Sequence, residues 1–504
     1  MSMLDRPLTL TFALLAAASL APFAGAQMAP IPSSLQHPYL DSGALDGPTA
    51  GAEEAVVFTQ LVSSPYASWV RLVFAAETRL SGASRLRLTA LRDGGIQLHR
   101  AASLEEWSRS SCFFNGGEVV VELLAARGTS GNRVALESLE VGAPNYAPES
   151  ICGPTDDRVR SFLQNQGRLS VGCTGWLIGR ANNGLDAALT AGHCVASSTN
   201  QILELNVPLS TSGGSVVRAA PNDQYPFNLW NNSSLNGGVG ADYAVATVGR
   251  NSNTNLLPTQ ANGNSFYVLG AVPSSGQIRI TGYGSSSTGT LNLVQKTHVG
   301  PYSSRTATAI SYATDTTGGN SGSPIVNEAN GQAVGIHTHG GCSSTGGANN
   351  GTRIDRSDLT TAIRNLTRVA GSTSSFGTGC PATTTLSFSA EPRIGTSLNA
   401  IFGGVVANRP ATIVIGASRT NWLGLPLPFA LDGAGATSCS LRVGYDIPLP
   451  ATTNVLGSLL FPISIPNDGA LVGARAYLQL LYSHPGLNPA SLGTSPGGEI
   501  VVGS

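Results

Sequence analysis

The sequence predicts a mostly β protein with about three domains. Its 504 residues are about three times the roughly 150 residues of a typical domain. Glycine occurs 61 times, and short apolar segments separated by turn-forming residues recur along the chain, which is typical of short strands. The best helix candidate, residues 359–366, is short and carries its apolar residues at helical spacing. We therefore expect a strand-rich chain with few helices.

The first 26 residues have the pattern of a secretory signal peptide. Arg6 precedes an apolar run over residues 8–20, and the small residues 24–26 offer a cleavage site before Gln27. This run is too short to span a bilayer. No later segment has 18 uninterrupted apolar residues, so we expect a secreted protein without a membrane span. Its cysteines would then meet an oxidising compartment.

The overall charge is low and balanced. The chain has 28 basic and 29 acidic residues, a net charge of −1, and 11% charged residues. A nucleic-acid-binding surface needs an excess of positive charge, so no nucleic-acid partner is expected. We expect a monomer.

Residues 27–145 are predicted to form an N-terminal β domain. After an irregular leader over 27–50, segments with strand-like composition follow one another at short intervals, which favours a small β-sandwich. They are residues 55–58, 69–74, 86–91, 119–124 and 134–141. This domain is a propeptide, a substrate-positioning domain or a structural accessory domain, and the sequence leaves these alternatives open. Residues 143–148 are interpreted as the linker that follows it.

Residues 380–504 are predicted to form a C-terminal β domain. Short strand-like segments such as 412–415 and 476–481 are separated by Gly/Pro turns. The preceding residues 369–379 contain the run Gly371–Ser375 and are interpreted as a flexible linker. This domain either attaches to a surface or substrate or stabilises the protein.

Three motifs in the central region carry chemistry. In residues 318–324, Ser321 lies between glycines and just before an apolar strand. Glycine allows positive φ, so the N–H groups of Gly319 and Ser321 can converge and stabilise an oxyanion. Upstream, His193 ends an apolar strand, and Asp242 opens an alternating apolar strand. The pattern predicts a serine nucleophile with a histidine and an aspartate.

The chain order His193, Asp242, Ser321 is the order found in chymotrypsin-type proteases. An α/β-hydrolase would need Gly-x-Ser-x-Gly, but position 323 is serine. Over residues 150–368 the chain resembles the trypsin/chymotrypsin family. It is most similar to the bacterial branch with the glutamyl and lysyl endopeptidases, which carry Gly-x-Ser-Gly-Ser-Pro. The resemblance implies a chymotrypsin-like double β-barrel over 146–368, ending in the predicted helix.

The resemblance also implies a secreted serine endopeptidase that acts on proteins or peptides. His193 would be the general base, Asp242 would fix the imidazole tautomer, and Ser321 would form an acyl-enzyme. Asp186 and Asp223 compete for the aspartate's role, but Asp242 opens an apolar strand as the family's aspartate does.

Two further expectations concern the site as a whole. The seven histidines are scattered and only His337 and His339 are close in sequence, so no metal or other cofactor is expected. The alternative function is an exported adhesion or binding protein on an inert protease-like scaffold. Loss of a triad member would favour that alternative, and all three are present.

Asn320 precedes the nucleophile. At this position trypsin-like zymogens have an aspartate, which pairs with a newly formed N-terminal amine on activation. An asparagine carries no charge for that pair. If a latent form exists, we therefore expect steric masking by the N-terminal domain.

The residues that would read the substrate give conflicting signals. Asp315 lies six residues before Ser321, where trypsin has the aspartate that reads Arg or Lys. Thr316 and His337, however, resemble the glutamate-reading pair of glutamyl endopeptidases, and His339 is interpreted as a pocket-wall residue. Lysyl endopeptidases use an aspartate at the position of Gly351, so a lysine-only preference is unsupported. We expect a slight preference for acidic side chains.

The chain has seven cysteines. The resemblance implies a disulfide between Cys173 and Cys194 beside the catalytic histidine. It also implies one between Cys152 and Cys342. Cys380 and Cys439 would close a loop in the C-terminal domain. Cys112 is left over, and we expect a buried thiol rather than an intermolecular bond.

Overall fold

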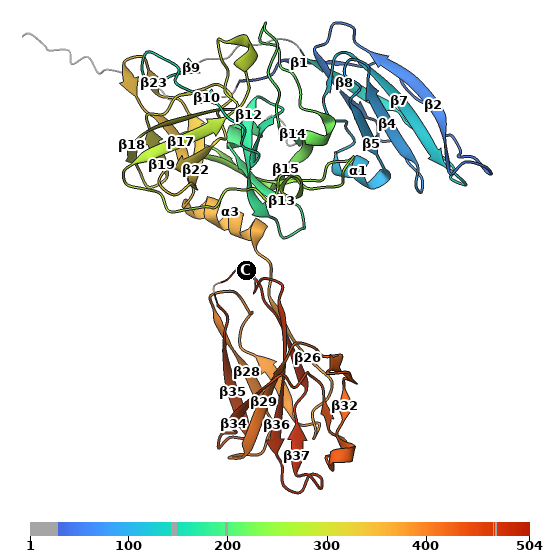
Figure 1. Cartoon of the computed structure of the whole chain (residues 1–504), viewed down its shortest axis with the longest axis vertical. Helices are drawn as coiled ribbons and strands as arrows, with labels where there is room; N and C mark the ends of the chain where they lie inside the picture. The colour runs from blue at the N-terminus through green and yellow to red at the C-terminus, as the bar shows by residue number, and fades with distance from the viewer. Residues whose placement is uncertain (1–28, 143–148, 197–199, 467, 469–470) are drawn as a thin grey trace, which may run out of the picture. The chain divides into compact units, whose positions relative to one another are not determined.

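The computed structural model describes residues 29–142, 149–196, 200–466, 468 and 471–504. The chain forms two compact units, Met1–Leu366 and Thr367–Ser504, and strands dominate both (Figure 1). The mostly β prediction is thus confirmed. The predicted signal peptide, 1–26, and the predicted linker, 143–148, lie outside the described residues. Among the described residues, no helix has the length and apolar character needed to cross a membrane.

The N-terminal part of the first unit contains two four-stranded antiparallel sheets. One has the order β1 (Ser33–Gln36), β8 (Leu136–Gly142), β3 (Trp69–Phe74) and β6 (Phe114–Asn115). The other has the order β2 (Glu54–Ser63), β7 (Glu118–Ala126), β4 (Arg85–Ala90) and β5 (Ile96–His99), after which α1 (Ala101–Glu106) follows.

Both of these sheets contribute to one hydrophobic core. Leu72 and Leu139 from the first sheet join Leu86 and Val121 from the second. Alternate residues of β4 are buried, as expected for strands with one face on a core. The expected sandwich-like arrangement is therefore present. Strand β1 lies within the leader that was expected to be irregular, because its backbone pairs with β8.

A closed six-stranded barrel follows. Its strand order is β11 (Gln166–Leu169), β12 (Cys173–Arg180), β13 (Asp186–Thr190), β16 (Asp242–Val248), β15 (Gln224–Asn236) and β14 (Asn200–Glu204). All residues of β13 and β16 are buried. The near-continuous apolar composition of these two strands reflects burial on both faces.

A second ring of six strands completes the double barrel. Its order is β18 (Lys296–Arg305), β17 (Gln277–Gly282), β21 (Pro324–Asn327), β22 (Gln332–His339), β25 (Asn349–Arg353) and β19 (Ala309–Tyr312). Pairing of β19 with β18 closes this ring, and β10 (Val159–Arg160) adds to β18. Helix α3 (Ser357–Thr367) follows and buries Leu359, Ile363 and Leu366. The predicted double-barrel core and its final helix are confirmed.

Short elements connect the barrel strands. The helical ones are η1 (Gly192–Cys194), η2 (Pro221–Asp223), α2 (Pro258–Ala261) and η3 (Gly289–Leu291). Two short strand pairs are β9 (Glu149–Ser150) with β20 (Thr316–Thr317) and β23 (Cys342–Ser343) with β24 (Gly346–Gly347). The first pair places a segment near the start of the barrel region beside the turn that carries Ser321.

The N-terminal sandwich and the first barrel share an apolar interface. Ile202 of β14 belongs to the core cluster of the sandwich. The Gln224 side chain accepts a hydrogen bond from the backbone N–H of Phe113 and donates one to its carbonyl, both at 2.8 Å. The Arg218 guanidinium lies 4.0 Å from the ring centre of Trp69 and 3.8 Å from that of Phe113. These contacts make the two parts one packed body.

A fully buried ion cluster lies behind this interface. Glu204 accepts hydrogen bonds from Arg168 at 2.9 Å and from Arg218 at 2.7 Å, and all three side chains are inaccessible to solvent. Burial alone would raise the pKa of Glu204, but the two arginines together lower it to about 2. Loss of one partner from such a cluster lowers the stability of the protein, because a charge then remains buried without compensation.

The second unit contains two further sheets. The larger has the order β26 (Ser372–Phe376), β38 (Gly497–Val501), β36 (Arg475–Ser483), β29 (Pro410–Gly416) and β34 (Ile447–Thr452), with β37 (Leu492–Thr494) also on β36. The smaller has the order β27 (Thr385–Phe388), β28 (Ser397–Gly403) and β35 (Ser458–Ser464). Phe402 and Leu480 from the two sheets share one core. Four short strands, β30 (Asn421–Trp422), β31 (Leu425–Pro426), β32 (Phe429–Ala430) and β33 (Ser440–Leu441), and η4 (Asp432–Ala434) complete the unit.

The predicted linker over 369–379 is wrong for its central part. Residues 372–376 form β26, the edge strand of the larger sheet, in register with residues 497–501 of β38. An edge strand needs only backbone hydrogen bonds on one side, and its serine and threonine side chains can face water. A Ser/Thr run of this kind has the same composition as a flexible linker, so composition could not distinguish the two.

The structure contains three disulfides, Cys152–Cys342, Cys173–Cys194 and Cys380–Cys439. These are the pairs that were expected. Cys112 is a free, buried thiol, and burial raises its pKa well above the ordinary value. A buried thiol with a raised pKa is a poor nucleophile, which fits a role in packing.

We predict that Glu204→Gln lowers the free energy of unfolding by about 3–5 kcal/mol, because both arginines lose their buried counter-charge. Glu204 contributes stability above its ordinary pKa of 4.5 and loses it as the pH falls towards its folded-state pKa of about 2. The variant should therefore lose less stability than the wild type between those pH values. Urea unfolding at several pH values measures both effects. Glu77→Gln, at an exposed position, is the control, and equal stability of the two variants would contradict the prediction.

Candidate active site

His193 and Asp242 form a buried pair at the end of the first barrel. His193 lies in η1, directly after β13, and Asp242 is the first residue of the neighbouring strand β16. The Nδ1 atom of His193 lies 2.6 Å from Oδ2 of Asp242, and the backbone N–H of His193 donates to Oδ1 at 3.1 Å. Both carboxylate oxygens are thus used to orient one residue. This arrangement places a proton on Nδ1 and leaves Nε2 as a base.

The second barrel holds Asp242 from the other side. The Thr352 hydroxyl, on β25, accepts from the backbone N–H of Asp242 at 3.1 Å and donates to its carbonyl at 2.7 Å. Asp242 therefore lies where the two barrels meet. Of the competing aspartates, Asp186 accepts from Thr259 at 2.7 and 2.8 Å, and Asp223 accepts from Asn206 at 2.7 Å. Their carboxylates thus serve other parts of the first barrel.

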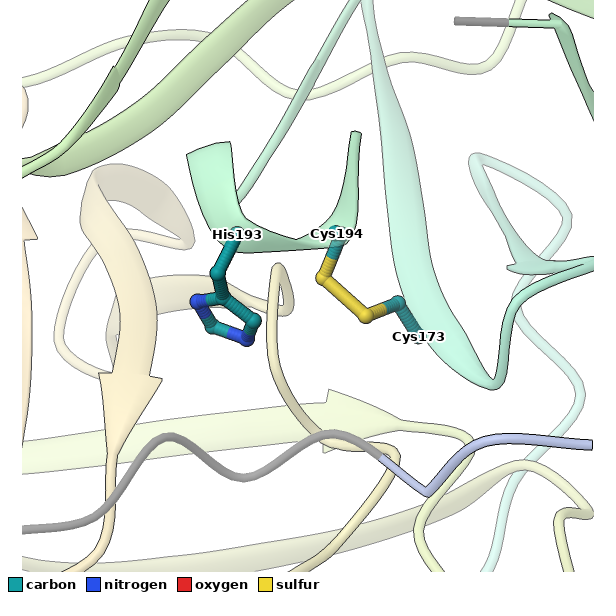
Figure 2. A group of neighbouring side chains, drawn as sticks. All are labelled: Cys173, His193 and Cys194. Carbon is teal, nitrogen blue, oxygen red and sulfur yellow. A yellow bond between two sulfur atoms is a disulfide. The ribbon is translucent and has the colours of Figure 1, made fainter. Parts of the chain in front are cut away.

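The Nε2 atom of His193 is the nitrogen expected to act as the base. Nε2 of His193 is buried and has no hydrogen-bond partner among the described residues. The next residue, Cys194, forms the disulfide with Cys173 beside the imidazole (Figure 2). The two sulfur atoms lie within 4.8 Å of a ring nitrogen, but they are bonded to each other and are not thiolates. This group therefore fits a structural disulfide better than a metal site.

The turn that carries Ser321 has the backbone form that the glycines predicted. Gly319 has a φ of +100° and Gly322 a φ of +87°. A Cβ atom on Gly319 would lie 2.4 Å from the carbonyl oxygen of Tyr283, so no other residue fits there. The carbonyls of Gly319 and Ser321 both accept hydrogen bonds from Thr174, at 2.9 and 2.8 Å. Within the described residues, the N–H groups of Gly319 and Ser321 make no hydrogen bond, as an oxyanion site requires.

Ser321 and His193 are linked through β22. The Ser321 hydroxyl donates to the carbonyl of Thr338 at 3.4 Å. The next residue, His339, packs its ring edge-on to that of His193, with ring centres 6.2 Å apart. His339 also lies 4.0 Å from Asp242 and bonds to the Thr338 hydroxyl at 2.8 Å. His339, expected at a pocket wall, thus lies beside the His193–Asp242 pair, and burial lowers its pKa.

The Asp315 carboxylate accepts hydrogen bonds from the protein backbone. Its two oxygens accept from the N–H groups of Cys152 at 2.8 Å and Asp157 at 2.9 Å, and its own N–H donates to Nδ1 of His298 at 2.9 Å. The side chain is inaccessible to solvent. A carboxylate held in this way is poorly placed to read a basic substrate side chain.

His337 is fully buried and pairs with a tyrosine. Its Nδ1 lies 2.6 Å from the hydroxyl of Tyr312. Burial, followed by the two neighbouring histidines 339 and 193, lowers the pKa of His337 to about 3. The imidazole is therefore neutral at physiological pH. Thr316 lies nearby on β20, where its hydroxyl accepts from the Asn349 amide at 2.8 Å.

Sequence reasoning did not identify Tyr312, Thr338 or Asn349 as part of this region. The location of each of these residues is set by pairing between strands that are distant in the sequence. Their residue types are common in strands and carry no local motif. Only the register of β19, β22 and β25 places them beside the predicted residues.

We predict that Asp315→Asn lowers the free energy of unfolding by about 1–3 kcal/mol, because one of the two backbone N–H groups that the buried carboxylate binds then faces an amide donor. Denaturant titration measures this change. Asp355→Asn is the matched control, since the Asp355 carboxylate pairs with Arg353 near the surface, and such pairs contribute only about 0–1 kcal/mol. A change no larger than that of the control would contradict the role described for Asp315.

Comparison with known proteins gives one family match and several similar structures. Residues 173–336 match the family profile of the trypsin-like peptidase domain. No curated protein sequence matches the chain significantly. Among solved structures, a Glu endopeptidase in complex with MPD has 23% identity and a TM-score of 0.33, covering 42% of this chain and 98% of its own. The protease Anisep from Arthrobacter nicotinovorans has 20% identity and a TM-score of 0.31, covering 39% and 92%. This chain thus contains a trypsin-like peptidase domain.

Proposed function

We propose that the protein is a serine endopeptidase that uses His193, Asp242 and Ser321. The observation that carries the proposal is the buried His193–Asp242 pair at 2.6 Å, together with the free N–H groups at Ser321. A binding protein on an inert scaffold would need neither a precisely oriented histidine nor a serine on such a turn. The adhesion alternative is therefore not favoured.

The proposed reaction proceeds through two tetrahedral intermediates. The Ser321 hydroxyl turns from the Thr338 carbonyl towards His193, transfers its proton to Nε2, and its oxygen attacks the peptide carbonyl carbon. The N–H groups of Gly319 and Ser321 bind the resulting oxyanion. His193 then gives the proton to the departing amine, and an acyl-enzyme forms. Water, activated by the same nitrogen, releases the acid product and restores Ser321.

Asp242 acts on His193 alone in this reaction. It keeps the Nδ1 proton in place and stabilises the imidazolium while Nε2 holds the proton from Ser321. Its second oxygen accepts from the backbone of the same residue, which limits rotation of the imidazole relative to the turn. Positioning of this kind lowers the entropy cost of reaching the reactive geometry.

We predict that Ser321→Ala lowers kcat/KM on peptides by at least about 10³-fold, because the nucleophile is lost. A mixed peptide library analysed by mass spectrometry and labelling with a fluorophosphonate both report on this residue. Ser323→Ala is the matched control, since its buried hydroxyl has no hydrogen-bond partner within the described part of the chain. Equal activity of wild type and Ser321→Ala would contradict the proposal.

For the substrate, we propose a preference for acidic side chains before the cleaved bond. Tyr312 can donate to Nδ1 of His337, which places the single proton of this neutral imidazole on Nε2, a donor suited to a carboxylate. Thr316 would provide a hydroxyl from β20. Asp315 supports this choice, because its carboxylate is occupied by two backbone N–H groups.

We predict that the ratio of kcat/KM for a Glu peptide to that for the matching Gln peptide stays constant from pH 5.5 to 8. The ratio cancels any effect of pH on the catalytic step that the two peptides share, and His337, with a pKa of about 3, is neutral throughout this range. A histidine with an ordinary pKa near 6.5 would instead lose its charge here, and the ratio would fall about tenfold per pH unit above that value. His337→Ala should lower the ratio about 10- to 100-fold at every pH. A ratio that falls with a midpoint near pH 6.5 would contradict a neutral His337.

We further propose that the protein is exported after loss of residues 1–26, with an N-terminal domain over 27–145, a protease domain over 146–368 and a C-terminal domain to residue 504. Three disulfides support an oxidising compartment. The shared interface at Ile202 and Arg218 supports an N-terminal domain that stays with the protease as a structural part.

A further inference from the structure

Asn320, next to the nucleophile, has a buried cation as its neighbour. Its Oδ1 atom accepts from the backbone N–H of Thr317 at 3.0 Å and from Nη1 of Arg158 at 3.2 Å. The Arg158 side chain is only 1% exposed. A guanidinium therefore lies at the place where the family's zymogens would bring an N-terminal amine.

All three nitrogens of the Arg158 guanidinium have partners. Nη1 also donates to the Thr317 hydroxyl at 2.6 Å, and Nη2 donates to the carbonyl of Ser285 at 3.0 Å. Nε and Nη2 each donate to Asp156 at 2.7 Å. The positive charge is thus balanced by one carboxylate two residues away. Nη1 binds the turn that precedes Ser321, through Thr317 and Asn320.

The partners of Arg158 surround the glycines of this turn. The Thr317 hydroxyl donates to the Ser285 carbonyl at 2.9 Å, and the Ser285 N–H donates to the Gly318 carbonyl at 2.7 Å. Gly318 and Gly319 have no side chains that could restrict their backbone. Their conformation therefore depends on the hydrogen bonds to their carbonyls and on the residues at either end, Thr317 and Asn320. Arg158 bonds to both end residues.

The segment that supplies Arg158 is itself fixed to the second barrel. Cys152 forms the disulfide with Cys342. The backbone N–H groups of Cys152 and Asp157 donate to the Asp315 carboxylate at 2.8 and 2.9 Å. Arg158 follows directly, so its guanidinium reaches the turn from a restrained backbone.

We propose that Arg158 is a positioning residue that holds residues 317–320 so that the N–H groups of Gly319 and Ser321 face the reacting carbonyl. It supplies from within the chain the cation that a free N-terminal amine supplies in trypsin-like enzymes. The site is then assembled with residues N-terminal to it still attached, and no newly formed amine is needed. This inference rests on the proposed peptidase function.

The test compares Arg158→Ala with Arg160→Ala in the chain from residue 27 to 504. Arg160 donates to the backbone carbonyls of Ser161, Gln295 and Val207 and does not contact the turn. For Arg158→Ala we expect kcat to fall about 10- to 100-fold with KM changed less than threefold, since oxyanion donors act on the transition state. Affinity for a peptide aldehyde, which forms a tetrahedral adduct, should fall in parallel. Affinity for the product peptide should not change.

Two further measurements separate positioning from a general loss of structure. Millimolar guanidinium should restore kcat of Arg158→Ala at least threefold, and urea at the same concentration should not. Arg158→Lys keeps the positive charge but has fewer donors, so its kcat should lie between those of the wild type and Arg158→Ala. This variant replaces Arg158→Ala in the comparison if Arg158→Ala does not fold. Thermal melting checks that each compared variant is folded.

The outcomes distinguish this inference from the proposed function. Wild-type kcat in folded Arg158→Lys and Arg158→Ala would overturn the inference, as would an equal loss of aldehyde and product affinity. A wild type without Ser321-dependent cleavage would instead overturn the proposed function. In that case hydrogen exchange tests whether Arg158 holds the turn. If it does, the amides of residues 317–321 exchange at least tenfold faster in Arg158→Ala than in Arg160→Ala. Equal exchange would overturn the inference independently of activity.

Discussion

The contact on which the site depends is the pair between Asp242 and His193. Asp242 can hold the imidazole only because β16 lies beside β13 in the first barrel and because Thr352 from the second barrel binds its backbone. The first barrel therefore supplies both members of the pair, and the second barrel fixes the backbone of the aspartate. Burial then excludes water that would compete for the carboxylate, which strengthens the interaction.

The sequence located residues whose position follows from local pattern. His193 and Asp242 lie at strand ends and Ser321 lies between glycines, and these local patterns, their order in the chain and the family resemblance together predicted the three residues. Arg158 could not be found in this way, because its partner Asn320 lies 162 residues further along and the run 156–158 has the composition of an exposed loop. The contact of Tyr312 with His337 could not be predicted either, because only strand pairing brings the two residues together.

The specificity residues show how geometry changes the interpretation of a sequence position. Asp315 has the residue type and spacing of a basic-side-chain reader, yet its oxygens accept from two backbone N–H groups. His337 has the residue type of a pH-dependent group, yet burial keeps it neutral. In both cases the number of hydrogen-bond partners and the loss of water decide the chemistry, and neither is encoded in a short motif.

The shared interface between the sandwich and the first barrel also constrains the order of folding. Phe113 and its hydrogen-bond partner Gln224 are 111 residues apart, and Ile202 is needed to complete the sandwich core. A chain that folds from its N-terminus therefore presents the sandwich with an unfinished apolar face. That face remains exposed to water until residues 202–224 follow. Folding of the two parts is consequently coupled, and formation of the first barrel is the step that completes both.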